Sequence, residues 1–297
     1  MGYSLVENQV GVLGATSVVG ASLLPLLQET HCQVTAFSRQ AAHESLDKVS
    51  WQQLPFFSNQ LFEKESKIPH WICAVPVWVL PQYFDLLETA GASRVVVLSS
   101  TSRFSKDESS DFEERVIAQR LAAAEQLVEA WAEEKGIQWI ILRPTLIYGF
   151  GRDKNITEIA RFISRFGFFP LYGNAAGLRQ PVHVTDVADV CVAALRTVST
   201  NQAYNISGGE TLTYREMVER IFGALGRRPR FLSVPLNVFK LTLACLRLLP
   251  RYKYWCATVA ERMNRDLVYE HSDASKNLGY KPRAFLLSKK DIQQPKL

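Results

Sequence analysis

Three small residues near the start of the chain, Gly14, Ser17 and Gly20, have a spacing that suits phosphate binding. The apolar run "VGVL" precedes them and "VVGASLLPLL" follows, so the pattern predicts a strand, a tight turn and a helix. Gly14 would permit the turn, Ser17 would let the backbone approach a pyrophosphate, and Gly20 would let the helix pack closely on the strand. Free N–H groups at the helix start bind anionic oxygens. The residues predicted to cradle a dinucleotide are Gly14, Ala15, Thr16, Ser17, Val18, Val19 and Gly20. The alternative is a tight turn without a ligand.

The end of the next predicted strand bears on which dinucleotide binds. The run "QVTAFSRQ" ends in Ser38 and Arg39, and no Asp or Glu follows before Glu44. An acidic residue about 20 residues after the loop would bind the ribose 2′-hydroxyl of NAD, whereas an Arg accommodates the 2′-phosphate of NADP. The sequence therefore favours NADP(H) over NAD(H). The alternative is an Arg39 that is simply solvated at a strand end.

The elements that would position this loop alternate along the first half of the chain. Strands are predicted at 8–14, 32–38, 71–76, 93–100 and 137–149, and helices at 18–28, 81–89 and 111–128. The runs "RVVVLSS" and "WIILRP" are apolar without alternation, as in strands buried on both faces of a parallel sheet. This pattern indicates an α/β fold, a Rossmann-type doubly wound parallel sheet over residues 1–150. Residues 151–297 are predicted to form a smaller C-terminal substrate-binding region, with about 181–207 returning to the sheet.

Composition narrows the class of protein. With 297 residues, 47% of them apolar, the chain can bury a large core. The net charge is +5, but Lys and Arg are scattered, so nucleic acid is not expected as the main partner. Five cysteines without a C-x-x-C pair indicate reduced thiols, no metal site and a cytoplasmic setting.

Residues 236–249 form the most apolar long stretch. Asn237, Lys240, Ala244 and Arg247 fall on one narrow helical stripe, and most other positions are apolar. So wide an apolar face is usually buried in the domain or in an oligomer, here a possible homodimer. The alternative is a basic amphipathic helix that rests on an anionic membrane surface.

Several ordered motifs resemble those of one family over nearly the whole chain. "GATSVVG", "VVVLSSTSRF", "LRPTLIYG" and "RQPVHVTDVADV" are similar to motifs of the extended short-chain dehydrogenase/reductase superfamily, specifically its NAD-dependent epimerase/dehydratase branch. The further positions expected to contact the cofactor are Ser38, Arg39, Ala74, Val75, Ser99, Arg120 and Pro144.

The resemblance implies a proton-transfer pair that this chain lacks. In the family, a Tyr and a Lys four residues later on one helix move a proton while hydride moves to or from nicotinamide. The aligned positions here are Val116 and Arg120, or Ile117 and Leu121 if the register slips by one. Arg120 does not titrate near neutrality, so it could hold the nicotinamide ribose but could not act as an acid. A solvated helix Arg is the alternative.

Other groups are candidates for the missing chemistry. Ser100 aligns with the hydroxyl residue that holds the substrate oxygen in the family, and Thr101 lies beside it. Tyr148 completes the predicted catalytic set. Further candidate proton donors are Lys106, Asp153, Lys154 and His183. Each has a structural alternative as a solvated loop residue, a packed strand end or a hydrogen-bonded core histidine.

The substrate side is expected to be cationic. By resemblance, Arg179 matches an Arg that contacts the diphosphate or ribose of a nucleotide sugar. Arg152 and Lys154 in the loop "GRDKN" suit an anionic ligand, although such residues could also form a solubilising rim. The predicted substrate-binding residues are Arg152, Lys154, Asn155, Arg179 and His183.

Two functions follow from these features. The first is an NADP(H)-dependent oxidoreductase or epimerase-type enzyme that acts on a nucleotide sugar or related carbonyl compound with a non-standard proton donor. The second is a catalytically degenerate NADP(H)-binding protein with a regulatory or assembly role. The retained Ser100 and cationic cleft residues favour the enzyme.

Overall fold

The computed structural model describes residues 9–30, 32–39, 48–54, 67–234 and 261–293. Their centre is a seven-stranded, wholly parallel sheet in the order β11-β6-β5-β4-β1-β2-β3. The strands are β1 (Gln9–Leu13), β2 (Gln33–Ser38), β3 (Val49–Gln53), β4 (His70–Cys73), β5 (Arg94–Leu98), β6 (Gln138–Pro144) and β11 (Gln202–Ile206). The predicted Rossmann-type α/β fold is confirmed. The stretch 236–249 lies outside the described residues.

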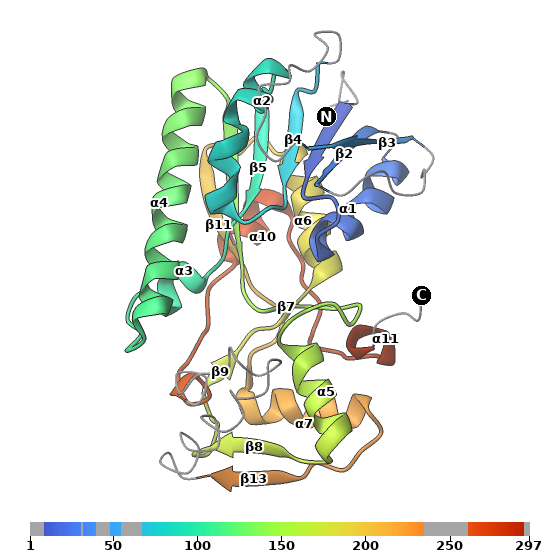
Figure 1. The fold of residues 1–297 in the computed structure, drawn as a ribbon, viewed down its shortest axis with the longest axis vertical. Coiled ribbons are helices and arrows are strands. Elements are labelled where there is room, and N and C mark those ends of the chain that lie inside the picture. The colour runs from blue at the N-terminus through green and yellow to red at the C-terminus, as the bar shows by residue number, and fades with distance from the viewer. Residues whose placement is uncertain (1–8, 31, 40–47, 55–66, 235–260, 294–297) are drawn as a thin grey trace.

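Helices cover both faces of the sheet (Figure 1). On one face, α1 (Val18–Glu29) packs against α6 (Val184–Arg196), and their Val, Leu and Ala side chains share one core with β1, β2 and β6. On the other face, η1 (Val77–Tyr83), α2 (Phe84–Thr89) and α4 (Phe112–Lys135) enclose a second core around Trp71. This double cover explains why the central strands are apolar at almost every position.

A smaller region lies beyond the carboxyl ends of the strands (Figure 1). It contains α5 (Ile156–Phe166), α7 (Tyr214–Ala224) and the parallel pair β8 (Phe169–Tyr172) and β13 (Phe231–Val234), around an aromatic-rich core of its own. Short elements join the two regions: α3 (Ser102–Ser105), β7 (Ile147–Tyr148), β9 (Leu178–Arg179), β10 (Val182–His183), β12 (Leu212–Thr213), α10 (Ser272–Leu278) and α11 (Lys289–Ile292). The chain returns from this region to the sheet through α6 and β11.

Several elements differ from the sequence-based prediction; the helix predicted at 81–89, for example, is divided between η1 and α2. The edge strand β3 was not predicted, because its sequence "VSWQQ" is mostly polar and it gains its place by pairing with β2. Helix α4 extends past 128 to Lys135 and ends at Gly136, whose φ of 67° is left-handed.

The turn after β1 has the close contacts that its small residues predict. Gly14 has a φ of 79°, and a Cβ there would lie 2.9 Å from the backbone of Ala74 and Val75. A Cβ on Gly20 would lie 2.2 Å from the Gly14 carbonyl oxygen. Ser17 caps α1, because its side chain accepts a hydrogen bond from the Gly20 N–H at 3.0 Å.

Within the described ranges, no helix combines the length and the hydropathy needed to cross a bilayer. Cys32, Cys73 and Cys191 are buried free thiols, and burial raises the pKa of Cys73 and of Cys191. Cys73 and Cys191 therefore stay protonated near neutral pH.

We predict opposite effects from two Gly-to-Ala substitutions in helices. Gly20→Ala places a methyl group against rigid backbone and should lower the free energy of unfolding by about 1–3 kcal/mol. Gly223→Ala in α7 meets no atom within 4 Å. It should raise the free energy of unfolding by up to about 1 kcal/mol, because Ala is the better helix former. Urea unfolding of both variants tests the pair, and similar changes in the two would contradict the packing argument.

Candidate functional site

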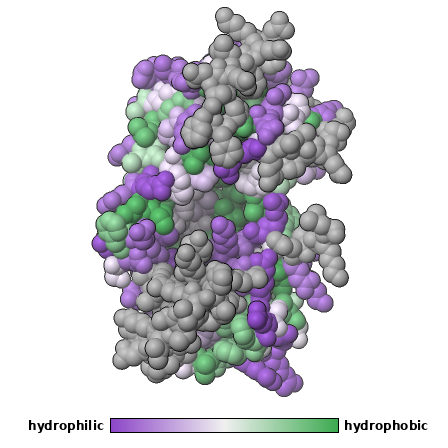
Figure 2. Space-filling model, viewed as in Figure 1, coloured by the Kyte–Doolittle hydropathy of each residue, from purple (hydrophilic) through white to green (hydrophobic). Residues whose placement is uncertain are grey.

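A cleft of about 630 Å3 separates the carboxyl ends of the sheet strands from the smaller region. Figure 2 shows the surface hollowed between the upper and lower parts of the molecule. The sheet side contributes predicted residues Ser17, Val18, Val19, Ala74, Val75, Ser99, Ser100, Thr101 and Pro144. The opposite side contributes predicted residues Arg152, Lys154, Asn155 and Arg179. The topology therefore gathers most of the predicted site in one place.

The phosphate loop forms one end of this cleft. Val18 and Val19 open α1 and line the cleft, directly before Gly20, whose N–H donates to the Ser17 side chain. Because Gly14 and Gly20 carry no side chain, the backbone N–H groups at the positive end of the helix dipole are not covered by one. Gly14, Ala15, Thr16 and Gly20 support this turn from behind rather than line the cleft. The arrangement fits the diphosphate of a dinucleotide.

Ser38 and Arg39 mark the end of β2. Ser38 is buried, Arg39 is exposed, and the Arg39 carbonyl accepts a hydrogen bond from Gln53 Nε2 at 3.3 Å. Neither residue lines the cleft. The preference for NADP(H) thus stays a prediction.

Three neighbouring hydroxyls follow β5 and have different hydrogen bonds. Ser99 Oγ donates to Glu125 Oε1 at 2.5 Å, and Thr101 Oγ1 donates to the Pro144 carbonyl at 3.2 Å. Ser100 Oγ instead accepts from the Ser102 N–H at 3.1 Å. Among the described contacts, Ser99 and Thr101 donate their hydroxyl hydrogens to protein acceptors, whereas Ser100 does not.

Behind these hydroxyls lies a buried carboxylate that local sequence reasoning missed. Glu125 on α4 is 0% exposed and forms ion pairs with Arg103 and with Arg143, the latter at 2.6 Å. Together with the Ser99 bond, these contacts tie α4 to α3, β5 and β6. Glu125 therefore holds the wall of the cleft in place.

The wall contributed by α4 is apolar. Leu121 lines the cleft. Arg120 is exposed and does not line it, but its guanidinium is 5.2 Å from the centre of the ring of Trp78, a lining residue. The contact of Arg120 with the nicotinamide ribose stays a prediction. Helix α4 contains no Tyr, and its single Lys is Lys135 at the far end.

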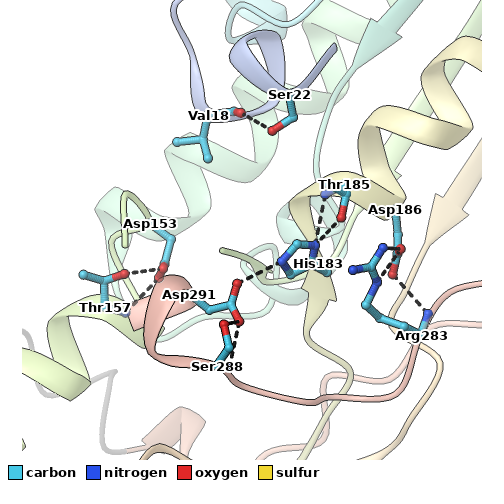
Figure 3. Close-up of polar contacts among 10 residues, drawn as sticks. All are labelled: Val18, Ser22, Asp153, Thr157, His183, Thr185, Asp186, Arg283, Ser288 and Asp291. Carbon is cyan, nitrogen blue, oxygen red and sulfur yellow. Dashed lines mark hydrogen bonds and ion pairs between the residues drawn. The ribbon is translucent and has the colours of Figure 1, made fainter. Parts of the chain in front are cut away.

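Tyr148 and His183 lie beneath the cleft rather than in it. Tyr148 is fully buried edge-on against His183, and burial raises its pKa, which makes it a poor acid. His183 caps α6 by accepting from the Thr185 N–H, and its Nε2 is 3.1 Å from Asp291 Oδ1 (Figure 3). Burial opposes ionisation of Asp291, but hydrogen bonds from His183 and Ser288 lower its pKa to about 2. Neither residue lines the cleft, and their described contacts are those of packing and capping. The catalytic role of Tyr148 and the substrate role of His183 stay predictions.

Asp153 and Arg152 also have structural partners. Asp153 Oδ1 accepts from the N–H groups of Asn155 and Thr157 at 2.9 and 3.1 Å at the start of α5 (Figure 3). Arg152 Nη2 reaches across the cleft to the Thr16 carbonyl at 3.1 Å. Arg152, predicted on the substrate side, thus also touches the phosphate loop.

Arg179 is a buried cation in the opposite wall. It is 5% exposed, and its guanidinium donates to the carbonyls of Leu178 and Arg265 at 2.7 and 2.8 Å. Burial lowers its pKa to about 10, so it stays charged at neutral pH. The described residues give it no ion pair with a carboxylate. Main-chain carbonyls thus hold the charge beside the cleft.

Two lining residues come from a distant part of the chain. Arg262 lines the cleft and pairs with Glu114 at the start of α4 at 3.1 Å. Tyr269 also lines it, and burial raises the pKa of this phenol. Arg262 and Tyr269 follow Arg179 by more than 80 positions in the chain. Local residue spacing therefore could not predict that they lie near it.

Comparison with known proteins agrees with this geometry. Residues 82–207 match the sequence model of the NAD dependent epimerase/dehydratase family. Over this span the chain is similar to the family. The same fold occurs in UDP-N-acetylglucosamine 4-epimerase from Bacillus cereus, with a TM-score of 0.70 and 16% identity over 96% of this chain and 94% of that one. UDP-glucuronic acid 4-epimerase from Bacillus cereus in complex with NAD gives a TM-score of 0.70 and 14% identity over 96% of both chains.

The curated relatives of this chain are of mixed kinds. It is 30% identical over 128 residues to NADH dehydrogenase [ubiquinone] 1 alpha subcomplex subunit 9 of Arabidopsis thaliana, covering 42% of this chain and 30% of that protein. UDP-glucose 4-epimerase of Vibrio cholerae is 25% identical, covering 54% and 46%. The uncharacterized Escherichia coli protein YbjS is 23% identical, covering 92% and 93%. The chain spans less than half the length of the first two relatives.

We predict that Glu125→Ala is strongly destabilising. The substitution leaves Arg103 and Arg143 without their buried partner, which should lower the free energy of unfolding by about 3–5 kcal/mol. The control is Glu108→Ala, which breaks the exposed pair with Arg265 at 2.6 Å and should cost at most about 1 kcal/mol. Denaturant unfolding measures both, and equal losses would show that the buried network does not anchor α4.

Proposed function

We propose that the protein binds a nicotinamide dinucleotide and a nucleotide-diphosphate-linked carbonyl substrate in this cleft, and transfers hydride between them. One observation carries the proposal: the phosphate loop at Val18 and Val19 and the cations Arg179 and Arg262 line the same cleft. A dinucleotide diphosphate suits the loop, and a second anionic group suits the cations.

Relatives of the same fold support this ligand pair. Two solved structures that share the fold are described as complexes with UDP-glucose, one of them also with NAD. These structures are 13% and 21% identical to this chain, and we propose the same kinds of ligand for it. The buried position of Arg179 is what this chain itself adds, because a buried guanidinium is a strong site for a diphosphate oxygen.

The chain's own residues would divide the chemistry as follows. The dinucleotide supplies or accepts the hydride when it is bound. The Ser100 hydroxyl donates a hydrogen bond to the substrate oxygen, while Ser99 and Thr101 stay bonded to Glu125 and Pro144. Because the α4 wall at Leu121 offers no phenol or ammonium, the proton comes from another group of the cleft or from water. Reduction of a carbonyl tolerates this arrangement better than epimerisation, which also needs a base.

The choice of dinucleotide rests on Arg39. A guanidinium at the end of β2, with no carboxylate on that strand end, suits the 2′-phosphate of NADP(H). We therefore propose NADP(H) as the preferred cofactor. We also propose that the protein is located in the cytoplasm.

One observation favours a second function. The α4 wall is apolar at Leu121. A wall without an acid–base group is expected in a protein that binds a dinucleotide without turnover. The Arabidopsis relative is a subunit of NADH dehydrogenase by its name. In this alternative, the bound dinucleotide supports a regulatory or assembly role.

We predict that Arg262→Gln weakens binding of UDP, measured by calorimetry, by about 10-fold or more, because a charge-assisted hydrogen bond is lost. The control is Arg265→Gln, which also removes one positive charge from this segment. Arg265 forms the exposed ion pair with Glu108 instead. The control should bind UDP as the parent does. Equal losses in both variants would indicate long-range charge effects instead of direct contact.

Ser100→Ala tests whether the site turns over. With NADPH and a panel of keto-sugar nucleotides, the substitution should reduce kcat/KM by about 100-fold, because the substrate oxygen loses its hydrogen-bond donor. Ser93→Ala is the control, since Ser93 precedes β5 at the end away from the cleft and donates to Pro69. Full turnover in Ser100→Ala would remove Ser100 from the reaction. Dinucleotide binding without turnover in the parent protein would establish the second function.

A further inference from the structure

A basic end of the molecule lies far from the cleft, at the base of the smaller region (Figure 1). We define it by the exposed residues Arg165, Phe166, Arg228, Arg230 and Leu232. Phe166 is 41% exposed and Leu232 is 53% exposed, so the basic end combines apolar side chains with its arginines. None of the five lines the cleft.

Backbone contacts bring these residues together although they come from two segments. Arg227 Nη1 donates to the Ile163 carbonyl at 2.8 Å, so the loop after α7 lies against the end of α5. The Phe169 N–H donates to the Arg230 carbonyl at 2.9 Å, and Leu232 pairs with Pro170 between β13 and β8. The lower edge of Figure 2 shows hydrophilic and apolar side chains side by side.

The charge of the basic end is uncompensated. Residues 159–180 and 221–234 contain no Asp or Glu. The neighbouring cations Arg161 and Arg220 pair with Glu158 and Glu210. By contrast, Arg165, Arg228 and Arg230 form no ion pair in the described part of the chain. Their electrostatic potential is therefore free to attract an external anion.

We propose that this end rests on an anionic membrane surface. Guanidinium groups bind lipid phosphates, and the exposed Phe166 and Leu232 gain by leaving water at the headgroup boundary. A nucleic acid would satisfy the arginines but not an exposed aliphatic side chain. In the sequence, β13 is followed by residues 236–249, which are apolar except for Asn237, Lys240, Thr242 and Arg247. The proposal is independent of the reaction in the cleft.

Vesicle flotation of the full chain tests the proposal. The protein should float with phosphatidylcholine vesicles that contain phosphatidylglycerol and remain unbound with phosphatidylcholine alone. The triple variant Arg165→Gln, Arg228→Gln, Arg230→Gln should lose affinity by roughly 100-fold, since each cation near the surface contributes about 5-fold. Arg227 is left intact because it caps α5.

The matched control removes three exposed cations elsewhere: Lys281→Gln, Lys289→Gln, Lys290→Gln. It should bind vesicles as the parent does. Phe166→Ser with Leu232→Ser should weaken binding while leaving its salt dependence unchanged. Circular dichroism confirms that each variant is folded.

Three results would overturn the proposal. Equal loss in the control would mean that only net charge matters. Unchanged vesicle binding by the folded arginine variant would place the contact elsewhere on the chain. Binding of DNA but not of phosphatidylglycerol vesicles, abolished by the arginine substitutions, would identify a polyanion site instead of a membrane surface.

Discussion

The close contact between the start of α1 and the end of β1 is the constraint on which the cleft depends. A Cβ on Gly20 would meet the Gly14 carbonyl, so the helix meets the end of the strand backbone to backbone, and Gly14 in turn lies against the backbone of Ala74 and Val75. This contact aims the positive end of α1 at the edge where β1, β4, β5 and β6 end. Because all four strands are parallel, the phosphate loop and the hydroxyls after β5 open into the same space.

The two walls of that space are supported in different ways. On the sheet side, buried Glu125 holds Ser99 and two arginines, which stiffens the segment that carries Ser100. On the far side, main-chain carbonyls hold the guanidinium of Arg179 in a nearly dry setting. Both walls thus orient charge and hydrogen-bond donors, whereas α4 presents the apolar Leu121 to the cleft. Ligand binding is better provided for than acid–base chemistry.

Polar residues in this protein often serve as connectors between layers. His183 caps α6 and bonds Asp291, and Asp186 of the same helix pairs with Arg283 (Figure 3). Asp153 caps α5 in the same way. Each of these side chains has the chemistry of a catalytic group, but its hydrogen bonds are taken by the protein. Residue type alone therefore suggests more candidate catalytic residues than the structure leaves available.

The sequence by itself determined the Rossmann-type sheet, the phosphate loop and most lining residues of the sheet side, because these depend on local periodicity and on small residues at fixed spacing. It also determined that α4 holds no Tyr, since this is a matter of composition. Only the tertiary structure decided that Leu121 and not Arg120 lines the cleft, because a rotation of one helical residue changes which side chain points inward. The same holds for Glu125, Arg262 and the burial of Tyr148. Their roles arise from contacts between segments distant in the chain, which leave no trace in local spacing.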